Sequence, residues 1–283
     1  MGASASRNWL VGVSALEPEP EEALGLGQLP TELLEMVLSH VPPHVLLGRC
    51  RRVCRRWRDL VDCQALWLNI LARDHAALWP VLRTCLPPAD DPRPCVLGRF
   101  CELRPIGRNL LRNPKGEGFL KWTVLSSEDG WAAEEENSEV IPSAYMLTSF
   151  LSAYRGYHKK QVLDLEKEGF WPELLDSGKI EICVIFPWRK DQQRTDCIYQ
   201  LTVRLLDANQ AILDHFSPLP FPIWKWRNTY LFSFLQVSHV FSNLKKGVRF
   251  VSFECCTWDL EFRNEQYGIS VTNSSVIVQV CVS

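Results

Sequence analysis

Apolar side chains recur at helical spacing in the stretch from Leu29 to Leu60. The first stripe follows Pro30 and contains Leu33, Leu34, Val37, Leu38 and Val41. This spacing places the stripe on one side of a predicted amphipathic helix. Pro42 and Pro43 end that helix, because proline lacks the backbone donor and clashes with the preceding turn.

A second stripe continues after the prolines, and a third short helix is predicted from Leu66 to Leu71. The second stripe contains Leu46, Leu47, Cys50, Val53, Cys54, Trp57 and Leu60. These helices have too few apolar residues for a core of their own, so we expect the module to present an open apolar face to another protein. The alternative is an ordinary helical subdomain that packs on the rest of the chain.

From about residue 104 the pattern changes to short, partly alternating runs rich in Val, Ile and Phe. Such runs predict strands at 180–186, 198–206, 237–241, 248–253 and 275–282, with one helix at 168–175. Many short strands separated by turn residues favour an antiparallel β-sandwich or jelly roll. The predicted fold is α+β and multidomain: a flexible tail at 1–26, a small all-α module at 27–72, a linker with a helix at 73–103, and the sandwich at 104–283.

The composition narrows the class of protein without identifying it. A chain of 283 residues fits two domains, and its net charge of −2 creates no overall field for nucleic acid or a membrane. No apolar run reaches the roughly 18 residues that a membrane-spanning helix needs. The first residues lack the basic start and apolar run of a signal peptide, so we expect a cytoplasmic protein.

The 11 cysteines are irregularly spaced and are expected to stay reduced in the cytosol. Cys50 and Cys54 have helical spacing, but no histidine pair completes a zinc set, so buried thiols in an apolar stripe are the favoured interpretation. Cys255 and Cys256 are neighbours in a predicted strand and should point to opposite faces. We therefore expect no metal and no cofactor.

The sequence contains no nucleophile elbow, phosphate-cradling glycine loop or metal-binding His-Glu helix, and its histidines are scattered. We therefore expect a non-catalytic protein. One basic run contains Arg49, Arg51, Arg52, Arg55, Arg56 and Arg58. Such a run could neutralise nucleic-acid phosphates. The favoured alternative is the polar face of the helix, in contact with solvent or a partner, so no nucleic-acid partner is predicted.

The first six residues, MGASAS, match the N-myristoylation pattern, with Gly2 after the initiator methionine and Ser6 at the required offset. One myristoyl chain binds membranes only marginally, with an association constant of roughly 10⁴ per molar. We therefore expect reversible membrane contact through Gly2.

The helical stretch resembles the F-box. The resemblance rests on Leu29-Pro30, a helix, a proline break and the run from Cys50 to Trp57, with Leu66-Trp67 closing the module. F-boxes bind a Skp-type adaptor, which joins them to the cullin and RING subunits of an SCF-type ubiquitin ligase. The resemblance implies these adaptor-binding residues: Leu29, Pro30, Leu33, Leu34, Val37, Leu38, Val41, Pro42, Leu46, Cys50, Val53 and Trp57.

The second half resembles the F-box-associated domain of the sugar-recognising F-box proteins. The residues that carry this resemblance include the segments 104–111, 160–165, 171–176, 237–241, 247–254 and 271–276. It implies a ten-stranded sandwich whose loops bind N-glycans. The substrates would be glycoproteins exposed to the cytosol through failed secretion or a ruptured organelle, met at the cytosolic face of the endoplasmic reticulum or lysosome.

The resemblance assigns glycan binding to Phe150, Phe262, Arg263 and Asn264. Arg263 and Asn264 replace an aromatic ring and a lysine of the family pattern, which weakens the sugar interpretation. An F-box protein whose sandwich recognises a protein surface without sugar is therefore the alternative. The aromatic segment 220–234 fits either such a surface or an edge strand with one side buried.

Overall fold

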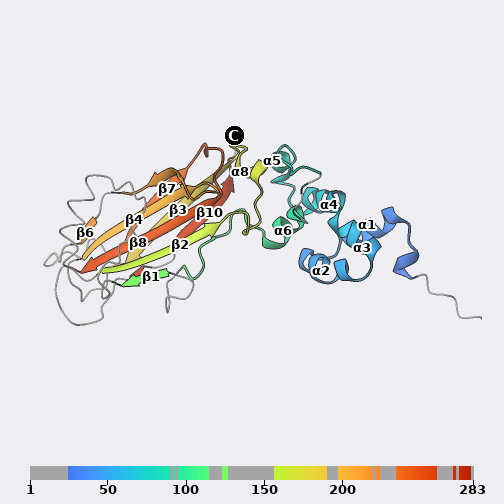
Figure 1. Cartoon of the computed structure of the whole chain (residues 1–283), viewed down its shortest axis with the longest axis horizontal. Coiled ribbons are helices and arrows are strands. Elements are labelled where there is room, and N and C mark those ends of the chain that lie inside the picture. Colours follow the sequence, from blue (N-terminus) through green and yellow to red (C-terminus); the bar gives the residue numbers. More distant parts are fainter. Residues whose placement is uncertain are drawn as a thin grey trace, which may run out of the picture.

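The computed structural model describes residues 25–89, 91, 93, 95–114, 123–126, 156–189, 197–218, 221–223, 234–259, 270–271 and 274–281. The molecule is elongated, with a group of short helices at one end and a β-sandwich at the other (Figure 1). This arrangement confirms the predicted order of an all-α module followed by a sandwich.

Eight short helical segments precede the sandwich in the described part of the chain: η1 (Leu26–Gln28), α1 (Thr31–Ser39), α2 (Pro43–Gly48), η2 (Cys50–Arg52), α3 (Arg55–Asp62), α4 (Gln64–Asp74), α5 (Trp79–Leu82) and α6 (Val96–Leu103). α1 is the helix that the first stripe predicts, and Pro43 occupies the first position of α2, where its missing donor costs nothing. The second stripe is divided between α2, η2 and α3.

Cys54 interrupts this second stripe in an extended conformation, as the N-cap of α3. Its side chain is exposed, whereas Cys50 is buried. The expectation that both thiols are buried is therefore wrong for Cys54, because the chain turns outward there instead of continuing as one helix.

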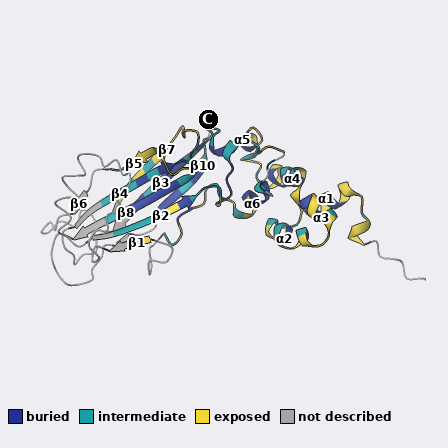
Figure 2. Cartoon of the chain, viewed as in Figure 1, coloured by how far each residue is buried: buried dark blue, intermediate teal, exposed yellow. Residues whose placement is uncertain are grey.

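Residues 73–103, expected to be a linker with one helix, contain both α5 and α6. α6 buries Leu97, Phe100 and Cys101 against the helical module, and the core residues form one continuous cluster that runs from α1 into the sandwich (Figure 2). The stretch is therefore a packed connection between the two ends of the molecule.

The strands form two antiparallel sheets. One has the order β1 (Thr123–Ser126), β2 (Gly156–Asp164), β8 (Phe250–Asp259), β4 (Cys197–Leu206) and β5 (Ile212–Phe216), with β6 (Phe221–Ile223) also paired to β4. The other has the order β10 (Ser275–Val280), β3 (Ile180–Arg189) and β7 (Phe234–Phe241), with β9 (Ser270–Val271) paired to β3. These six- and four-stranded sheets confirm the sandwich.

Alternation along the strands builds the core between the sheets. Phe186 of β3 and Phe253 of β8 face each other with ring centroids 6.0 Å apart. Cys255 is buried on the same side of β8 as Phe253, whereas Cys256 lies on the other face and is half-buried, as expected of neighbours in a strand. The predicted helix at 168–175 is shorter than expected, since only α8 (Pro172–Leu175) is helical.

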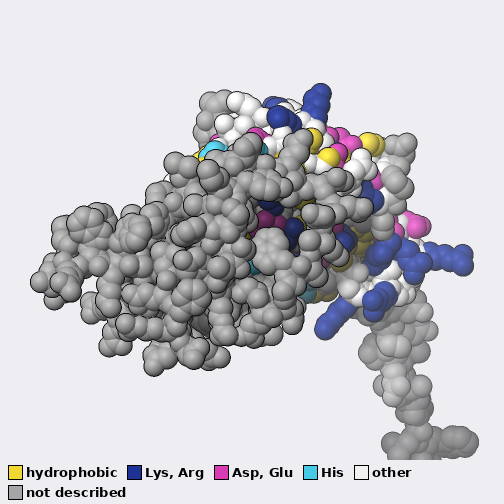
Figure 3. Space-filling model, turned by 60° about the vertical axis from the view of Figure 1, so that its left-hand side comes forward, with side chains coloured by type: hydrophobic (Ala, Val, Ile, Leu, Met, Phe, Trp, Pro, Cys, Tyr) yellow, Lys and Arg dark blue, Asp and Glu magenta, His cyan; other side chains and the backbone are white. Residues whose placement is uncertain are grey.

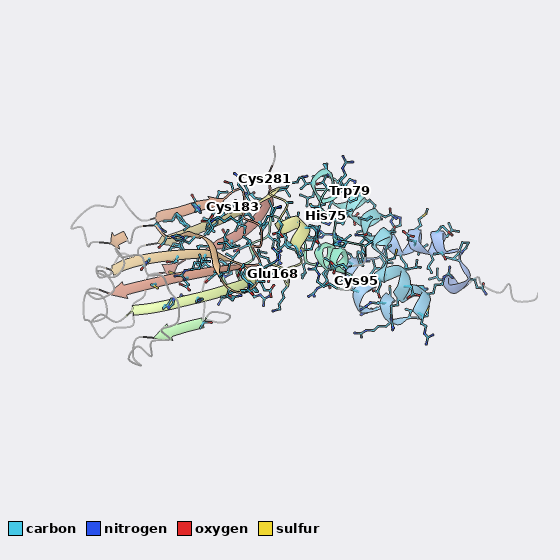
Figure 4. All side chains as sticks on the ribbon, turned by 45° about the horizontal axis from the view of Figure 1, so that its top comes forward. His75, Trp79, Cys95, Glu168, Cys183 and Cys281 are labelled. Carbon is cyan, nitrogen blue, oxygen red and sulfur yellow. The ribbon has the colours of Figure 1, made fainter. Side chains whose placement is uncertain are left out.

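Aromatic and ionic contacts close the junction between the two ends. Trp171, directly before α8, is fully buried and packs edge-on against Phe100 of α6 at a centroid distance of 5.3 Å. Glu168 lies on the sandwich side of this junction, with His75 and Trp79 on the helical side (Figure 4). Glu168 accepts hydrogen bonds from Arg108 and Arg112 at 2.7 and 3.0 Å.

Candidate adaptor interface

α1 separates its apolar residues onto two sides. Leu34 and Leu38 are buried in the chain's own core, whereas Leu33, Met36 and Val37 are 48%, 61% and 42% exposed. Residues three and four apart share a helix face, so these three side chains form one exposed apolar strip. Met36 was not among the predicted interface residues, although its spacing from Leu33 is the signal that would have found it.

The other predicted adaptor residues divide in the same way. Leu46 and Cys50 are buried, Leu29, Val41 and Trp57 are half-buried, and Pro30, Pro42 and Val53 are exposed. Leu34, Leu38, Leu46 and Cys50 therefore belong to the core that holds the helices together, because their positions on the stripe point inward. The exposed members are the ones available to a partner.

Arg56 of α3 holds the segment that precedes α1. Its guanidinium donates hydrogen bonds to the carbonyl oxygens of Gly27, at 2.8 Å, and Leu29, and to the hydroxyl of Thr31 at 3.3 Å. This clamp fixes η1 beside α3. The first residue of η1 is Leu26, and its side chain is exposed. Sequence reasoning assigned no such role to Arg56, because the contact joins residues far apart in the chain.

α4 supports α1 from the inner side. Arg73 donates to the carbonyl oxygen of Ser39 at 2.7 Å, and so satisfies a backbone acceptor at the end of α1. Asn69 donates to the carboxylate of Glu35 at 3.0 Å. The strip on α1 is therefore carried by a helix that is fixed at both ends.

The remaining arginines of the basic run have mixed roles. Arg51 makes a two-pronged ion pair with Asp62, at 2.7 and 3.1 Å. Burial raises the pKa of Asp62, but the hydrogen bonds from Arg51 and from the Cys95 thiol outweigh it and lower the pKa. Burial together with this carboxylate raises the pKa of Cys95 to about 12, so its thiol stays protonated and donates at 2.9 Å.

The part of the chain that the structure describes meets the requirements of neither a metal centre nor a membrane-spanning helix. Within the described residues, no group of three or more His, Cys, Asp or Glu is placed to hold a metal ion. The same part of the chain contains no helix that is both long and apolar enough to cross a membrane.

The predicted glycan-binding residues Phe150, Phe262, Arg263 and Asn264 lie outside the described residues, as do Gly2 and the side chains of the aromatic segment 220–234. The strand ends nearest to them are described. Gly156 at the start of β2 pairs with Trp258, and Asp259 at the end of β8 pairs with Cys197 of β4. The segments that contain Phe150 and Phe262 therefore join the same end of one sheet.

That end lies away from the helices. At the other end of the same sheet, Asp164 pairs with Phe250, and both line one pocket with Phe170 and with Val96 and Arg99 of α6. In Figure 1 the first end lies at the left-hand limit of the sandwich, and the helical module lies at the right. The exposed strip of α1 and the predicted glycan segments thus belong to opposite ends of the molecule.

Comparisons with known proteins agree with this division. A profile described as F-box-like matches residues 26–79, and one described as the F-box associated region matches residues 101–278. The chain is 58% identical over 287 residues to F-box only protein 27 of Homo sapiens and 57% identical over 289 residues to that of Macaca fascicularis, in each case over the full length of both chains. It is 43% identical over 291 residues to F-box only protein 17 of Homo sapiens, again at full length. The chain therefore belongs to the F-box only proteins that carry an F-box associated region, a family of non-catalytic adaptor subunits.

Proposed function

We propose that this chain is the substrate-recognition subunit of an SCF-type ubiquitin ligase. Its helical end binds a Skp-type adaptor, which brings the cullin and RING subunits, and its sandwich binds the protein to be ubiquitinated. The observation that carries the proposal is the exposed apolar strip of Leu33, Met36 and Val37 on a helix whose other side already fills the core.

The strip has the properties of a docking surface. Contiguous exposed apolar side chains on a soluble protein mark an interaction site, since covering them removes apolar area from water. Val53 is 61% exposed and Leu26 is also exposed, so apolar side chains before and after α1 in the sequence are also free to contact a partner. The clamp by Arg56 and the contacts from α4 hold α1 in place before a partner arrives, which lowers the cost of binding.

Co-purification with the adaptor tests this assignment. The double variant Leu33→Asp with Val37→Asp puts charge into the interface while leaving the core residues in place, so adaptor binding should be lost. The matched control is Val162→Asp with Val240→Asp, since these side chains are 45% and 46% exposed on the sandwich. Normal capture of the adaptor by the α1 double variant would contradict the proposal. Leu34 is unsuitable for this test because it is fully buried.

For the substrate, we infer N-glycosylated proteins that have become exposed to the cytosol. The inference is supported by the match to the F-box associated region and by Phe262, a flat ring of the kind that stacks on sugars. It is further supported by the strand ends, since the segments of Phe150 and Phe262 join one end of the same sheet. Such substrates would come from failed secretion or from a ruptured organelle, at the cytosolic face of the endoplasmic reticulum or lysosome.

Binding of the adaptor complex to a glycan array tests the substrate class. The array carries high-mannose, complex-type and non-glycosylated probes. The complex should bind one of the two glycan classes selectively. The Phe262→Ala variant should lose that binding while still capturing the adaptor. Signals no higher than the non-glycosylated control would contradict the glycan assignment.

Recognition of a protein surface without sugar is the second candidate. It is favoured by Arg263 and Asn264, which stand where the family pattern has an aromatic ring and a lysine. Enzymatic deglycosylation of captured partners separates the two: capture that survives the treatment favours a protein surface, and capture that is lost favours the glycan.

We further propose that Gly2 is myristoylated and gives the chain reversible contact with membranes. The support is the match of Gly2 and Ser6 to the acceptor pattern. A Gly2→Ala variant should move a membrane-bound fraction to the soluble fraction of cells. An unchanged distribution would count against acylation.

A further inference from the structure

Half of the basic run on η2 and α3 is engaged within the protein, and half is free. Arg51 pairs with Asp62, Arg56 binds the carbonyl groups of Gly27 and Leu29, and Arg58 donates to the carbonyl oxygen of Arg51 at 3.4 Å. The side chains of Arg49, Arg52 and Arg55 are exposed and have no ion pair within the described residues. We call these three residues the arginine surface. Figure 3 shows basic side chains projecting from the helical end of the molecule, and these are arginines, since the chain has no lysine before Lys115.

The arginine surface borders the point where the N-terminal segment joins the helices. Arg56, the neighbour of Arg55, holds the carbonyl oxygen of Gly27 at 2.8 Å. The chain that begins at Gly2 is therefore tied to the folded module beside the free arginines.

A single myristoyl chain needs a second membrane contact for stable binding, and a basic surface can provide it. We propose that the arginine surface is this second contact and binds the phosphate and carboxylate headgroups of anionic phospholipids in the membrane that receives the Gly2 acyl chain. This inference rests on the proposed acylation of Gly2. It adds a binding surface on the folded module and a lipid preference that acylation alone does not provide.

The tether explains why a lipid surface fits better than a nucleic acid or an acidic protein. Once the acyl chain is inserted, contact of the arginines with headgroups becomes intramolecular, and its effective concentration rises to the millimolar range expected of short linkers. Three free arginines then suffice for a contact that would be weak without the tether.

Four glutamates lie in the sequence between Gly2 and the first helix, and their negative charge opposes contact with anionic headgroups. They are Glu17, Glu19, Glu21 and Glu22. At physiological ionic strength charges interact over about 8 Å. The attraction between the arginine surface and an anionic membrane therefore depends on the charges close to it more than on the net charge of the chain. The proposal therefore predicts that changing these four glutamates to glutamine strengthens binding to anionic membranes.

Vesicle sedimentation of the full chain, acylated by a co-expressed myristoyltransferase and bound to its adaptor, tests the proposal. The vesicles contain phosphatidylcholine alone or with about a third phosphatidylserine. A basic residue near an anionic leaflet contributes about a fivefold gain in affinity, so the Arg49→Gln, Arg52→Gln, Arg55→Gln variant should bind the anionic vesicles roughly 100-fold more weakly. Its binding to phosphatidylcholine alone should be unchanged.

The matched control carries Arg83→Gln, Arg99→Gln and Lys246→Gln, which remove the same charge from exposed residues elsewhere. This control should keep the preference for phosphatidylserine. An equal loss in both triple variants, or no loss in the arginine-surface variant, would overturn the proposal. So would an adaptor complex that gains nothing from phosphatidylserine, since the adaptor would then cover the arginines.

Intact-mass measurement separates failure of the lipid premise from failure of the surface. An intact mass that lacks the myristoyl group would overturn the proposal, because its first premise is the acylation of Gly2. An acylated chain that binds both kinds of vesicle equally would refute the arginine surface and leave Gly2 as the only anchor. If the protein binds RNA in a salt-dependent way and as strongly as it binds anionic vesicles, the lipid assignment would also be overturned.

Discussion

The indole N–H of Trp171 donates a hydrogen bond to the carbonyl oxygen of Cys85 at 2.6 Å, and both residues are buried. Trp171 precedes the α8 turn of the sandwich, and Cys85 follows α5, so the bond joins the two ends of the molecule. Together with the packing of Trp171 on Phe100, it turns residues 73–103 into a fixed spacer. The proposed function, with an adaptor at one end and a substrate at the other, requires such a spacer for their relative placement.

Replacing Trp171 with Phe should lower the free energy of unfolding by about 1–3 kcal/mol, because the buried Cys85 carbonyl loses its donor. Denaturant unfolding of the purified chain measures this change. Trp79→Phe is the control, since the Trp79 indole is half-buried and makes no hydrogen bond within the described part of the chain. Equal losses in the two variants would show that ring size, and not the hydrogen bond, carries the effect.

Gly98 is required by the close approach of α6 to Trp67. A Cβ atom at Gly98 would lie 2.7 Å from Cζ2 and 2.8 Å from Cε2 of Trp67. The ring cannot move aside easily, because it is buried and its Nε1 donates to the carbonyl oxygen of Val61 at 2.7 Å. Gly98→Ala should therefore destabilise the chain by about 1–3 kcal/mol, measured by denaturant unfolding.

Gly48 is the matched position for this substitution. It lies at the end of α2, and a Cβ atom added there would meet no other atom within 4 Å. Gly48→Ala should be neutral or stabilise by about 0.4–1 kcal/mol, because alanine restricts the unfolded chain. A large loss at Gly48 would mean that the helical module tolerates no change and would remove the special role of Gly98.

His75 makes stability depend on pH. Burial lowers its pKa, and the charge of Arg104 lowers it further against the opposing charge of Asp74. The unfolded chain binds a proton at this site near pH 6.5 while the folded chain does not, so the free energy of unfolding should fall as pH drops below about 6.5. Above that pH the contribution is fully present.

His75→Phe should make this decline shallower, since phenylalanine keeps the edge contact with Phe100 but binds no proton. Urea unfolding at about pH 7.5 and about pH 5.5 gives the comparison. His158 and His239 also have pKa values lowered by burial, so part of the slope should remain. An unchanged slope in the variant would contradict a folded state in which His75 stays neutral.

The sequence pattern predicted the helices and strands that bury one face and carry apolar residues at regular spacing along it. α1 follows from the stripe between Pro30 and Pro42, and β3 and β8 follow from runs of branched and aromatic residues. β2 was missed because it carries Lys159 and Lys160 within a buried sheet. Its place depends on a distant partner, since Lys160 pairs with Glu254 of β8 at 2.8 Å.

Two other features needed the tertiary structure. α6 begins after Cys95, whose left-handed backbone follows a proline-rich stretch that resembles a linker. At the candidate interface, Leu33 and Leu34 are equivalent in a broad apolar stripe. The packing of the helices, with α1 against α4, leaves Leu34 buried and Leu33 exposed. The pattern therefore predicts the module and most of its apolar residues, whereas the division between core and partner surface follows from contacts across the fold.

Arg56 is expected to affect adaptor binding although it lies outside the apolar strip. Its guanidinium reaches both Gly27 and Leu29, so it arranges the segment before α1 without belonging to the apolar strip. Arg56→Gln cannot span the two carbonyl groups and should weaken adaptor binding by roughly five- to tenfold, since each lost hydrogen bond is worth about 1 kcal/mol or less at a partly exposed site. Titration of the purified adaptor against the variant measures this change.

Arg58→Gln is the control on the same helix, because the one hydrogen bond that Arg58 makes to a described residue is a 3.4 Å contact with the carbonyl oxygen of Arg51. It removes the same charge and should leave adaptor affinity within about twofold, since isolated surface charges contribute little. Equal weakening by the two variants would mean that charge alone acts at this surface. A selective effect of Arg56 would show that the adaptor requires the η1 segment in the position that the clamp imposes.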